Sequence, residues 1–325
     1  MDAYDIRKKL IKKIAGENSI IFTPEDRLVR KLSKSLNFTY MVISNDSIFY
    51  IVHEAQDDDT IDANDKILTI DPDSELKKIV LGKKILSPEP EKFRNLKAEF
   101  IDLTEIFRKP YDDEIQIFKN GASLIDQAFE KFINNIKIGM KEFEIKAEID
   151  YAIMKMGFES FSYPTVVLTG ERTSIPLGKT SDRILENGDI IQIDFSPVLN
   201  GYEFSMARVI FTELNENTKD LWKKYNKVFE IVSPYLKPGV ECNKIDSITR
   251  NYIQNLGFSY PHYSGYPLGG FSKPNIYPGS NDYLERNNVF VFSPGLYIKK
   301  KFGFRIKRMI HINDDGFETF DKFGE

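Results

Sequence analysis

The sequence predicts an α/β (α+β) protein of two domains, and three features of the 325-residue chain indicate this arrangement. Short helical and extended patterns alternate through the first part of the chain, so we expect a small α/β domain over 1–108. A long amphipathic helical pattern follows from Lys109. A motif that occurs twice in the rest of the chain predicts a larger domain over 109–325, built from two similar halves around an approximate two-fold axis.

The small domain is expected to contain short strands between charged helices. Pro24, followed by two acidic residues, is typical of a helix start, so we place the second helix there. Asn45 and Asp46 separate two stretches of strand composition, which predicts a hairpin, and the acidic stretch 56–65 is expected to be an exposed loop. The expected elements are helices over 3–16, 24–36 and 74–81, and strands over 19–22, 38–44, 47–53, 66–70 and around 100–101.

The repeated motif spans 139–158 and 239–258. Each copy is typical of a glycine turn, a helix and a second glycine that ends the helix. The copies are offset by 100 residues throughout, with matched pairs at Lys137 and Lys237, Ile145 and Ile245, Ile153 and Ile253, and Gly157 and Gly257. A sheet shared between two such halves would leave a cleft at its centre, and we expect the functional site there.

Composition limits the classes of function. The net charge of −4 gives a nucleic-acid partner no overall electrostatic support, whereas a basic protein partner would be tolerated. The single cysteine, Cys242, rules out an internal disulfide and fits a reducing compartment, so we expect an intracellular protein. The N-terminal stretch lacks the apolar core of a signal peptide, and no apolar run approaches the length of a membrane span.

The stretch 188–208, GDIIQIDFSPVLNGYEFSMAR, contains a carboxylate inside an apolar strand pattern. Burying Asp194 is costly unless a metal ion, a cation or several donors satisfy it. Asn200 and Gly201 predict a hairpin turn, after which the chain returns as a strand over 202–210. We expect Asp194 to face Ser205 across this hairpin.

This stretch resembles the signature hairpin of the creatinase/prolidase/methionine aminopeptidase superfamily, the pita-bread metallopeptidases. The resemblance covers about 109–318, and the arrangement of 1–108 resembles the N-terminal domain of the creatinase and prolidase branch. It implies a pita-bread fold for the larger domain. In active members of the family, two aspartates of the hairpin bind a pair of divalent metal ions. The first of these matches Asp194, whereas the second is replaced by Ser205.

Other family motifs keep their scaffold residues and lose their functional ones. Arg305 matches the family pattern, but Leu177 stands where the family has a histidine that contacts substrate and is the catalytic base in creatinase. A leucine carries no exchangeable proton, so that acid–base role is absent. Of the five positions that bind metal in the family, only Asp194 keeps its carboxylate, and the other four are Ser205, Tyr266, Ser293 and Lys307.

One carboxylate cannot hold two divalent ions, and an ammonium at the site repels a cation. We therefore expect no metal, no cofactor and no catalytic residue among these positions. Lys307 is expected to form a salt bridge that neutralises Asp194. The alternative is that this pair fills the electrostatic role of the metal and leaves a polar pocket.

The remaining candidates each have a structural and a functional interpretation. His262 either binds a peptide or an anion, as the resemblance implies, or is held by a backbone carbonyl. Ser205, Tyr266 and Ser293 are expected to pack and hold water, with a hydrogen-bonding pocket for a small ligand as the alternative. Cys242, at the start of the second repeat helix, is expected to be a buried and inert thiol.

The loss of metal ligands favours a metal-free, non-catalytic relative of Xaa-Pro peptidases that binds a peptide or protein. The N-terminal domain of the FACT histone chaperone large subunit is similar in plan, which would imply histone partners and a nuclear location. The alternative function is a Xaa-Pro dipeptidase or aminopeptidase with an atypical metal site, which would be cytoplasmic. A creatinase-like, metal-independent amidinohydrolase is a further alternative, against which Leu177 argues. Two-domain peptidases of the family are usually homodimers, so a homodimer is compatible with this resemblance.

Overall fold

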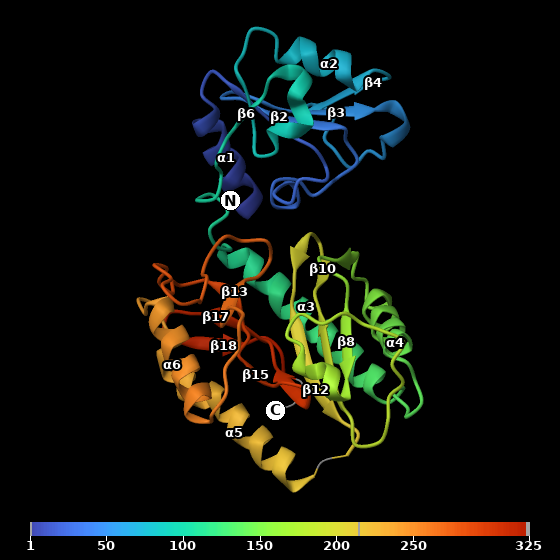
Figure 1. The fold of residues 1–325 in the computed structure, drawn as a ribbon. Helices are drawn as coiled ribbons and strands as arrows, with labels where there is room; N and C mark the ends of the chain where they lie inside the picture. Colours follow the sequence, from blue (N-terminus) through green and yellow to red (C-terminus); the bar gives the residue numbers. More distant parts are fainter. Residues whose placement is uncertain (1, 214, 323–325) are drawn as a thin grey trace. The chain divides into compact units, whose positions relative to one another are not determined.

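The computed structural model describes residues 2–213 and 215–322 and has the mixed α/β architecture that the sequence predicts (Figure 1). The chain divides into two compact units, Met1–Arg108 and Lys109–Glu325. Among the described residues, no helix is long and apolar enough to cross a membrane.

The first unit is a six-stranded mixed sheet in the order β4-β3-β2-β1-β5-β6. Neighbouring side chains on a strand point to opposite faces of the sheet, so successive residues of β1 pack in two different hydrophobic cores. Ile20 packs in one core with Ile11, and Ile21 packs in the other with Leu76. Its elements are α1 (Ala3–Ala15), β1 (Ser19–Phe22), β2 (Tyr40–Ile43), β3 (Ile48–His53), β4 (Lys66–Thr69), α2 (Pro72–Ile79), β5 (Ile85–Ser87) and β6 (Glu99–Phe100).

The helix expected over 24–36 is wrong, because only the short 3-10 segment Val29–Lys31 forms there. Local side-chain hydrogen bonds compete with the helix on both sides of this segment. Asp26 Oδ1 accepts from the backbone N–H of Leu28 at 2.8 Å, and the Ser33 hydroxyl donates to the carbonyl of Ser35 at 2.7 Å. The sequence reading also missed β5, whose three residues are too few to show a period.

The second unit contains the two predicted halves, each with a helix that begins and ends 100 residues from its counterpart. These helices are α4 (Glu142–Lys155) and α6 (Cys242–Asn255), and Figure 1 shows them on opposite sides of the unit. The preceding glycines, Gly139 and Gly239, have φ angles of +94° and +83°. An L side chain disfavours that conformation, which explains why both copies of the motif begin with glycine.

Strands from the two halves meet beside the predicted site. The other elements are α3 (Asp112–Ile133), β7 (Ser160–Phe161), β8 (Val166–Thr169), β9 (Ile190–Phe195), β10 (Pro197–Leu199), β11 (Tyr202–Glu203), β12 (Met206–Phe211), α5 (Glu216–Val232), β13 (Gly265–Pro267), β14 (Val289–Phe292), β15 (Gly295–Ile298), β16 (Phe302–Arg305), β17 (Arg308–Ile312) and β18 (Phe317–Thr319). One half has the sheet β12-β9-β8 and the other the sheet β13-β14-β17-β18. An antiparallel bridge joins Ala207 to Lys307, again 100 residues apart. This junction therefore lies where the approximate two-fold axis relates the halves.

The long helix α3 packs its apolar side into the core of the first half. Gly121 permits this approach, because a Cβ atom built there would lie 2.2 Å from the ring of Phe204. Tyr202 anchors the hairpin to the same helix through a hydrogen bond from its hydroxyl to Glu114. The hairpin that follows Asp194 is thus packed against α3.

Candidate active site

Asp194 is presented by the most buried strand of the first half. All six residues of β9 are buried, and β9 lies in the centre of its sheet between β12 and β8. Because side chains alternate along a strand, Gln192 and Asp194 share one face. The turn at Asn200 and Gly201 forms as predicted, with both φ angles positive. The expected pairing is wrong, however, since the residue opposite Asp194 is Ala207 and not Ser205.

Asp194 lies between two cations. Its Oδ1 is 2.6 Å from the Lys307 ammonium and accepts from the Tyr163 hydroxyl at 2.6 Å, and its Oδ2 is 3.3 Å from Arg305 Nη1. Burial raises the pKa of this carboxyl, but Lys307 and Arg305 outweigh burial and hold the pKa below its ordinary value. Asp194 is therefore ionised and charge-paired.

Hydroxyl groups complete the cluster around the ammonium. Lys307 also donates to Tyr163 at 2.7 Å and to Ser205 Oγ at 3.1 Å, and Ser205 lies 3.0 Å from the Tyr266 hydroxyl. The ammonium lies 5.0 Å and 5.6 Å from the ring centroids of Tyr163 and Tyr266, which is within cation–π range. Ser293 Oγ accepts from Arg305 Nε at 3.3 Å. The structure thus brings together Arg305 and all five positions at which the resemblance implies metal ligands.

A cavity of about 640 Å³ opens over this cluster. Its floor carries Asp194, Arg305 and Lys307, which together leave one net positive charge. Two of its buried polar atoms, Gln192 Oε1 and Thr165 Oγ1, have no hydrogen-bond partner among the described residues. Buried polar atoms are normally paired, so these two are suited to a polar ligand. Its apolar walls include Phe143, Val166, Leu168, Pro176 and Leu177.

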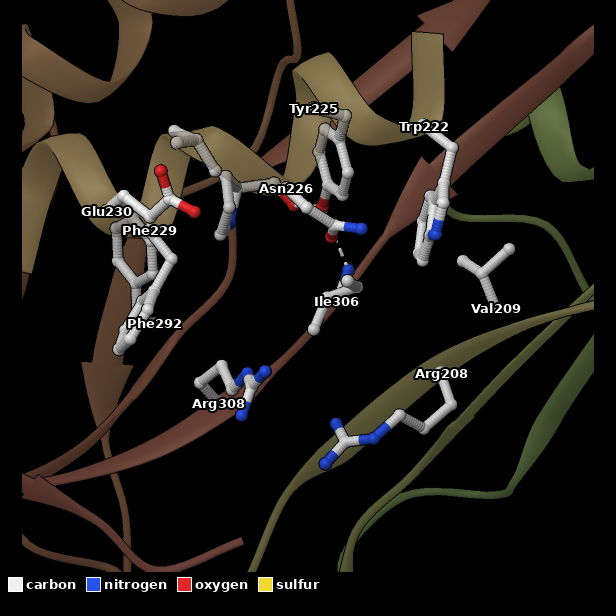
Figure 2. A pocket seen from close by; sticks show the side chains of 12 residues that line it. Arg208, Val209, Trp222, Tyr225, Asn226, Phe229, Glu230, Phe292, Ile306 and Arg308 are labelled. Atoms are coloured by element: carbon white, nitrogen blue, oxygen red, sulfur yellow. Dashed lines mark hydrogen bonds between the residues drawn. The ribbon is translucent and has the colours of Figure 1, made fainter. Parts of the chain in front are cut away.

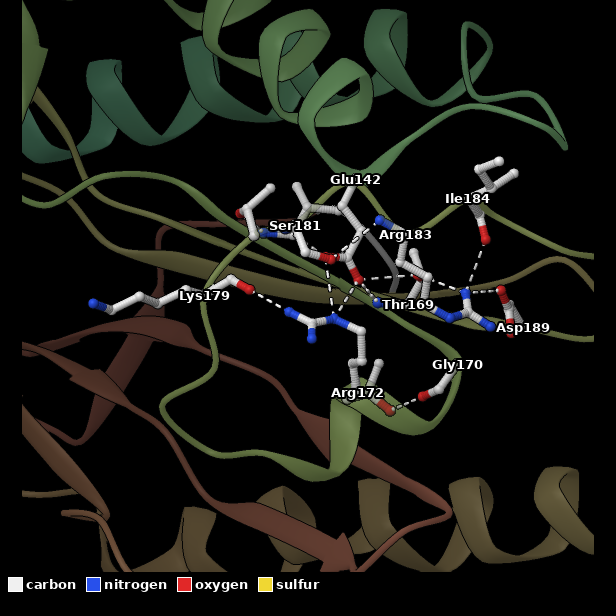
Figure 3. A network of polar contacts seen from close by, with 12 residues as sticks. Glu142, Thr169, Gly170, Arg172, Lys179, Ser181, Arg183, Ile184 and Asp189 are labelled. Atoms are coloured by element: carbon white, nitrogen blue, oxygen red, sulfur yellow. Dashed lines mark hydrogen bonds and ion pairs between the residues drawn. The ribbon is translucent and has the colours of Figure 1, made fainter.

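A buried carboxylate fixes the loop that carries part of this wall (Figure 3). Glu142, at the start of α4, accepts from Thr169 and Ser181 and pairs with Arg172 at 3.1 Å. Arg183 pairs with Asp189 beside it. These contacts hold both ends of the segment 170–181 against α4. In the middle of the segment, the carbonyl of Pro176 accepts a hydrogen bond from Arg305 Nη1 at 3.4 Å.

The metal pair that the resemblance implies does not fit these residues. Lys307 places a positive charge 2.6 Å from the only carboxylate that remains at the five positions. Among the described residues, no group of three or more His, Cys, Asp or Glu side chains is arranged to hold a metal ion. Hydroxyls and an ammonium are not the donor set that divalent ions require.

His262 does not belong to the set of described residues that line the cavity. Its Nε2 lies 2.9 Å from the Tyr297 hydroxyl and its Nδ1 lies 3.0 Å from the carbonyl oxygen of Tyr263. Burial and the nearby Arg305 lower the pKa of His262 to about 4, so the ring is neutral at pH 7. Burial likewise raises the pKa of the Cys242 thiol to about 12, which suits an inert thiol.

The sequence reading missed Tyr163, Gln192, Thr165 and Glu142. A signal existed for Gln192, which precedes Asp194 by two positions on a predicted strand and so had to share its face. Tyr163 and Thr165 lie just before β8, whose Val166 pairs with Asp194. That pairing follows from the tertiary structure, and a single sequence does not reveal it.

The sequence matches a known protein family and several peptidases of bacteria and archaea. Residues 116–314 match the model of metallopeptidase family M24. The chain is 27% identical over 215 residues to the Xaa-Pro dipeptidase of Pyrococcus furiosus, across 65% of this chain and 62% of that protein. An uncharacterized peptidase of Bacillus subtilis is 28% identical over 233 residues, across 68% of this chain and 65% of the relative. The matched region thus spans slightly less than two thirds of each relative.

Solved structures match over almost the whole chain. The X-Pro aminopeptidase from Thermotoga maritima superimposes with a TM-score of 0.84 at 25% identity, covering 98% of both chains. The prolidase from Pyrococcus furiosus has the same fold, with a TM-score of 0.85 at 21% identity and coverage of 98% and 100%.

These matches correct the main functional expectation. The relatives include Xaa-Pro dipeptidases, an X-Pro aminopeptidase and a prolidase, so the hypothesis of a non-catalytic, FACT-like histone chaperone domain is wrong. The nuclear location that followed from it has no support either. That hypothesis relied on a similarity in plan, which the family match and the structural matches outweigh.

The family match extends over more than half of the chain and includes both strands of the signature hairpin. The fold agrees with that match through both of its halves. The chain therefore belongs to metallopeptidase family M24, within the creatinase/prolidase superfamily of pita-bread proteins.

Proposed function

We propose that this chain is a Xaa-Pro peptidase with an atypical, metal-free centre. The observation that carries the proposal is the pairing of Lys307 and Arg305 with Asp194 at the floor of the cavity. One carboxylate shared by two cations leaves a positive charge where relatives of this family would hold metal ions. The peptide substrate class comes from the Xaa-Pro peptidases to which the chain is similar.

The cavity suits a short peptide with a free carboxylate. The net positive charge of the floor attracts a negatively charged group, and guanidinium groups bind carboxylates in a fixed geometry. The apolar wall around Pro176 and Leu177 offers a surface for a proline ring. The unpaired Gln192 Oε1 can accept a hydrogen bond from a substrate N–H, and Thr165 can donate or accept one.

In hydrolysis, a water molecule adds to the carbonyl carbon and builds negative charge on the carbonyl oxygen. The C–N bond then breaks, and solvent water takes the proton from the attacking water and returns one to the departing amine. The Arg305 guanidinium is held in place before substrate binds, so it can stabilise that charge without reorganisation. The three N–H groups of Lys307 already donate to Asp194, Tyr163 and Ser205, so Lys307 contributes its positive charge and no further hydrogen bond. Asp194 positions both cations, and its lowered pKa makes it a poor proton acceptor. Since general-base catalysis typically contributes about 10²–10⁴-fold, we expect turnover slower than that of metal-dependent relatives by about this factor.

The test is cleavage of Xaa-Pro dipeptides by the purified chain in excess chelator, with a Xaa-Ala dipeptide as the specificity control. We expect slow cleavage of the Xaa-Pro substrates that chelator does not abolish. The Arg305→Gln variant, purified identically, should lose this activity, whereas Lys301→Gln, at an exposed lysine, should keep it. This pair also controls for contaminating host peptidases. Absence of cleavage, or cleavage that needs added metal, would overturn the proposal.

A further inference from the structure

A second cavity, of about 310 Å³, lies between α5 and the strands around the junction of the two halves. Alternate residues of one extended stretch line the two cavities. Arg305 and Lys307 line the candidate active site, and Ile306 and Arg308 line the second cavity. Successive side chains of an extended chain point to opposite sides, so the second cavity is a separate site. Nothing in the proposed function uses it.

A buried arginine with an unpaired donor lines this cavity. Arg208 is 5% exposed. Its Nη1 donates to the carbonyl of Lys307 at 2.7 Å, and its Nη2 donates to Asp321 Oδ2 at 2.5 Å. Its Nε has no hydrogen-bond partner among the described residues. A buried donor on a charged group is costly to leave unpaired, so this atom is suited to an acceptor supplied by a ligand.

A second guanidinium faces the first across the cavity. Figure 2 shows the head groups of Arg208 and Arg308 directed toward each other, below the residues of α5. Arg308 Nη1 lies 4.0 Å from the same oxygen of Asp321, and the Arg308 guanidinium lies 5.5 Å from the ring centroid of Phe229. Asp321 and Glu230 bring carboxylates to the same region, so an anion would be bound through the unpaired Arg208 Nε beside Arg308 and not through an excess of positive charge.

The opposite wall is aromatic and rigid. Trp222, Tyr225 and Phe229 project from α5 into the cavity (Figure 2). The Tyr225 hydroxyl is fixed between the Pro294 carbonyl, to which it donates at 3.0 Å, and the backbone N–H of Ile306, from which it accepts at 3.0 Å. A rigid apolar wall favours a flat ring and disfavours a strongly hydrated inorganic anion.

We propose that this cavity binds a small aromatic carboxylate. The carboxylate lies against Arg208 Nε beside Arg308, and the ring packs against the aromatic side chains of α5. The volume of about 310 Å³ is at the lower end of the range for ligand pockets and suits one ring with a short acidic arm. The ligand class follows from the two kinds of wall that the cavity presents.

Trp222 is the only tryptophan of the chain, so its fluorescence reports directly on this cavity. The experiment titrates the full chain with phenylacetate and, separately, with the neutral isostere phenylacetamide. We expect a saturable fluorescence change with phenylacetate and at least about tenfold weaker binding of the amide, because hydrogen bonds to charged groups are lost. This comparison needs no variant and therefore cannot fail through misfolding.

Two variants then locate the ligand. Arg308→Gln should weaken phenylacetate binding at least about tenfold, and Lys301→Gln, which removes the same charge from an exposed position, should leave it unchanged. Arg305→Gln should also leave it unchanged, since Arg305 lines the other cavity. The proposal is overturned by the absence of saturation, by equal binding of the amide, or by a titration that depends on Arg305 and not on Arg308.

Discussion

Replacing Lys307 with methionine should strongly destabilise the larger unit. Methionine keeps the length of the side chain and removes its charge, so the change tests the charge pair more than the packing. In the variant, Asp194 stays 5% exposed and loses its partner at 2.6 Å. Tyr163 and Ser205 also lose a donor.

The magnitude follows from the burial of the pair. Removing one partner of a buried ion pair costs about 3–5 kcal/mol, because the remaining charge is left uncompensated. Arg305 still lies 3.3 Å from Asp194 Oδ2 and compensates part of the charge, so the lower end of that range applies. We expect a loss of about 3 kcal/mol, which corresponds to about 6–12 °C in Tm for a unit of this size.

Urea unfolding followed by the fluorescence of Trp222 measures this loss. Trp222 lies in the larger unit, so its signal is not averaged with the unfolding of the smaller one. Lys301→Met is the matched control, because it makes the same change at an exposed lysine and should stay within about 0.5 kcal/mol of the wild type. Adding Asp194→Asn to Lys307→Met should recover none of the loss, since it leaves the buried Arg305 guanidinium without its carboxylate. A Lys307→Met variant as stable as the wild type would refute the reasoning.

Three further results are expected. Glu142→Ala should lower the free energy of unfolding by about 3 kcal/mol, because it leaves Arg172 without its carboxylate. It should also speed hydrogen exchange across 170–181, and unchanged exchange there would contradict the role of Glu142 in fixing the loop. Burial lowers the pKa of His262 to about 4 in the folded state, so its contribution to stability is present above about pH 6.5 and is lost as pH falls toward 4. His262→Gln should therefore flatten the pH dependence of the free energy of urea unfolding between these values. An unchanged pH dependence would contradict the assignment of this effect to His262. Burial raises the pKa of Asp26 to about 6, so ionised Asp26 destabilises the smaller unit at pH 7. Calorimetry should find the Asp26→Asn variant more stable than the wild type by about 2–3 kcal/mol at pH 7 and little changed at pH 4. Equal gains in stability at both pH values would exclude ionisation of Asp26 as the cause.

The fold of the larger unit could be predicted from the sequence because the motif over 139–158 occurs again over 239–258. The glycines and apolar positions of the repeat fixed both α4 and α6, and the turn at Asn200 and Gly201 fixed the hairpin. The sequence failed where side chains compete with the backbone, as in the stretch from Asp26 to Ser35. No residue period distinguishes that stretch from a helix.

The sequence predicted the pair of Asp194 and Lys307 at the candidate site but not all of the other residues that surround it. Family positions indicated that Asp194 and Lys307 would converge, and they do. The contact of Tyr163 with both of them depends on how the segment before β8 packs against β9, which is a tertiary property. The hypothesis of a histone chaperone domain is wrong because the sequence and structural relatives include Xaa-Pro peptidases, which replacements at a few positions could not reveal.

The metal content of the purified chain tests the central claim most directly. The protein would be incubated with excess manganese, cobalt or zinc, freed of unbound ion, and analysed for bound metal, with cleavage of a Xaa-Pro dipeptide measured on the same sample. We expect near-zero metal per chain and cleavage that does not change with added ion, because Lys307 and Arg305 already neutralise Asp194. Two metal ions per chain, or cleavage that appears only with metal, would contradict the claim that side-chain cations take the place of the metal pair.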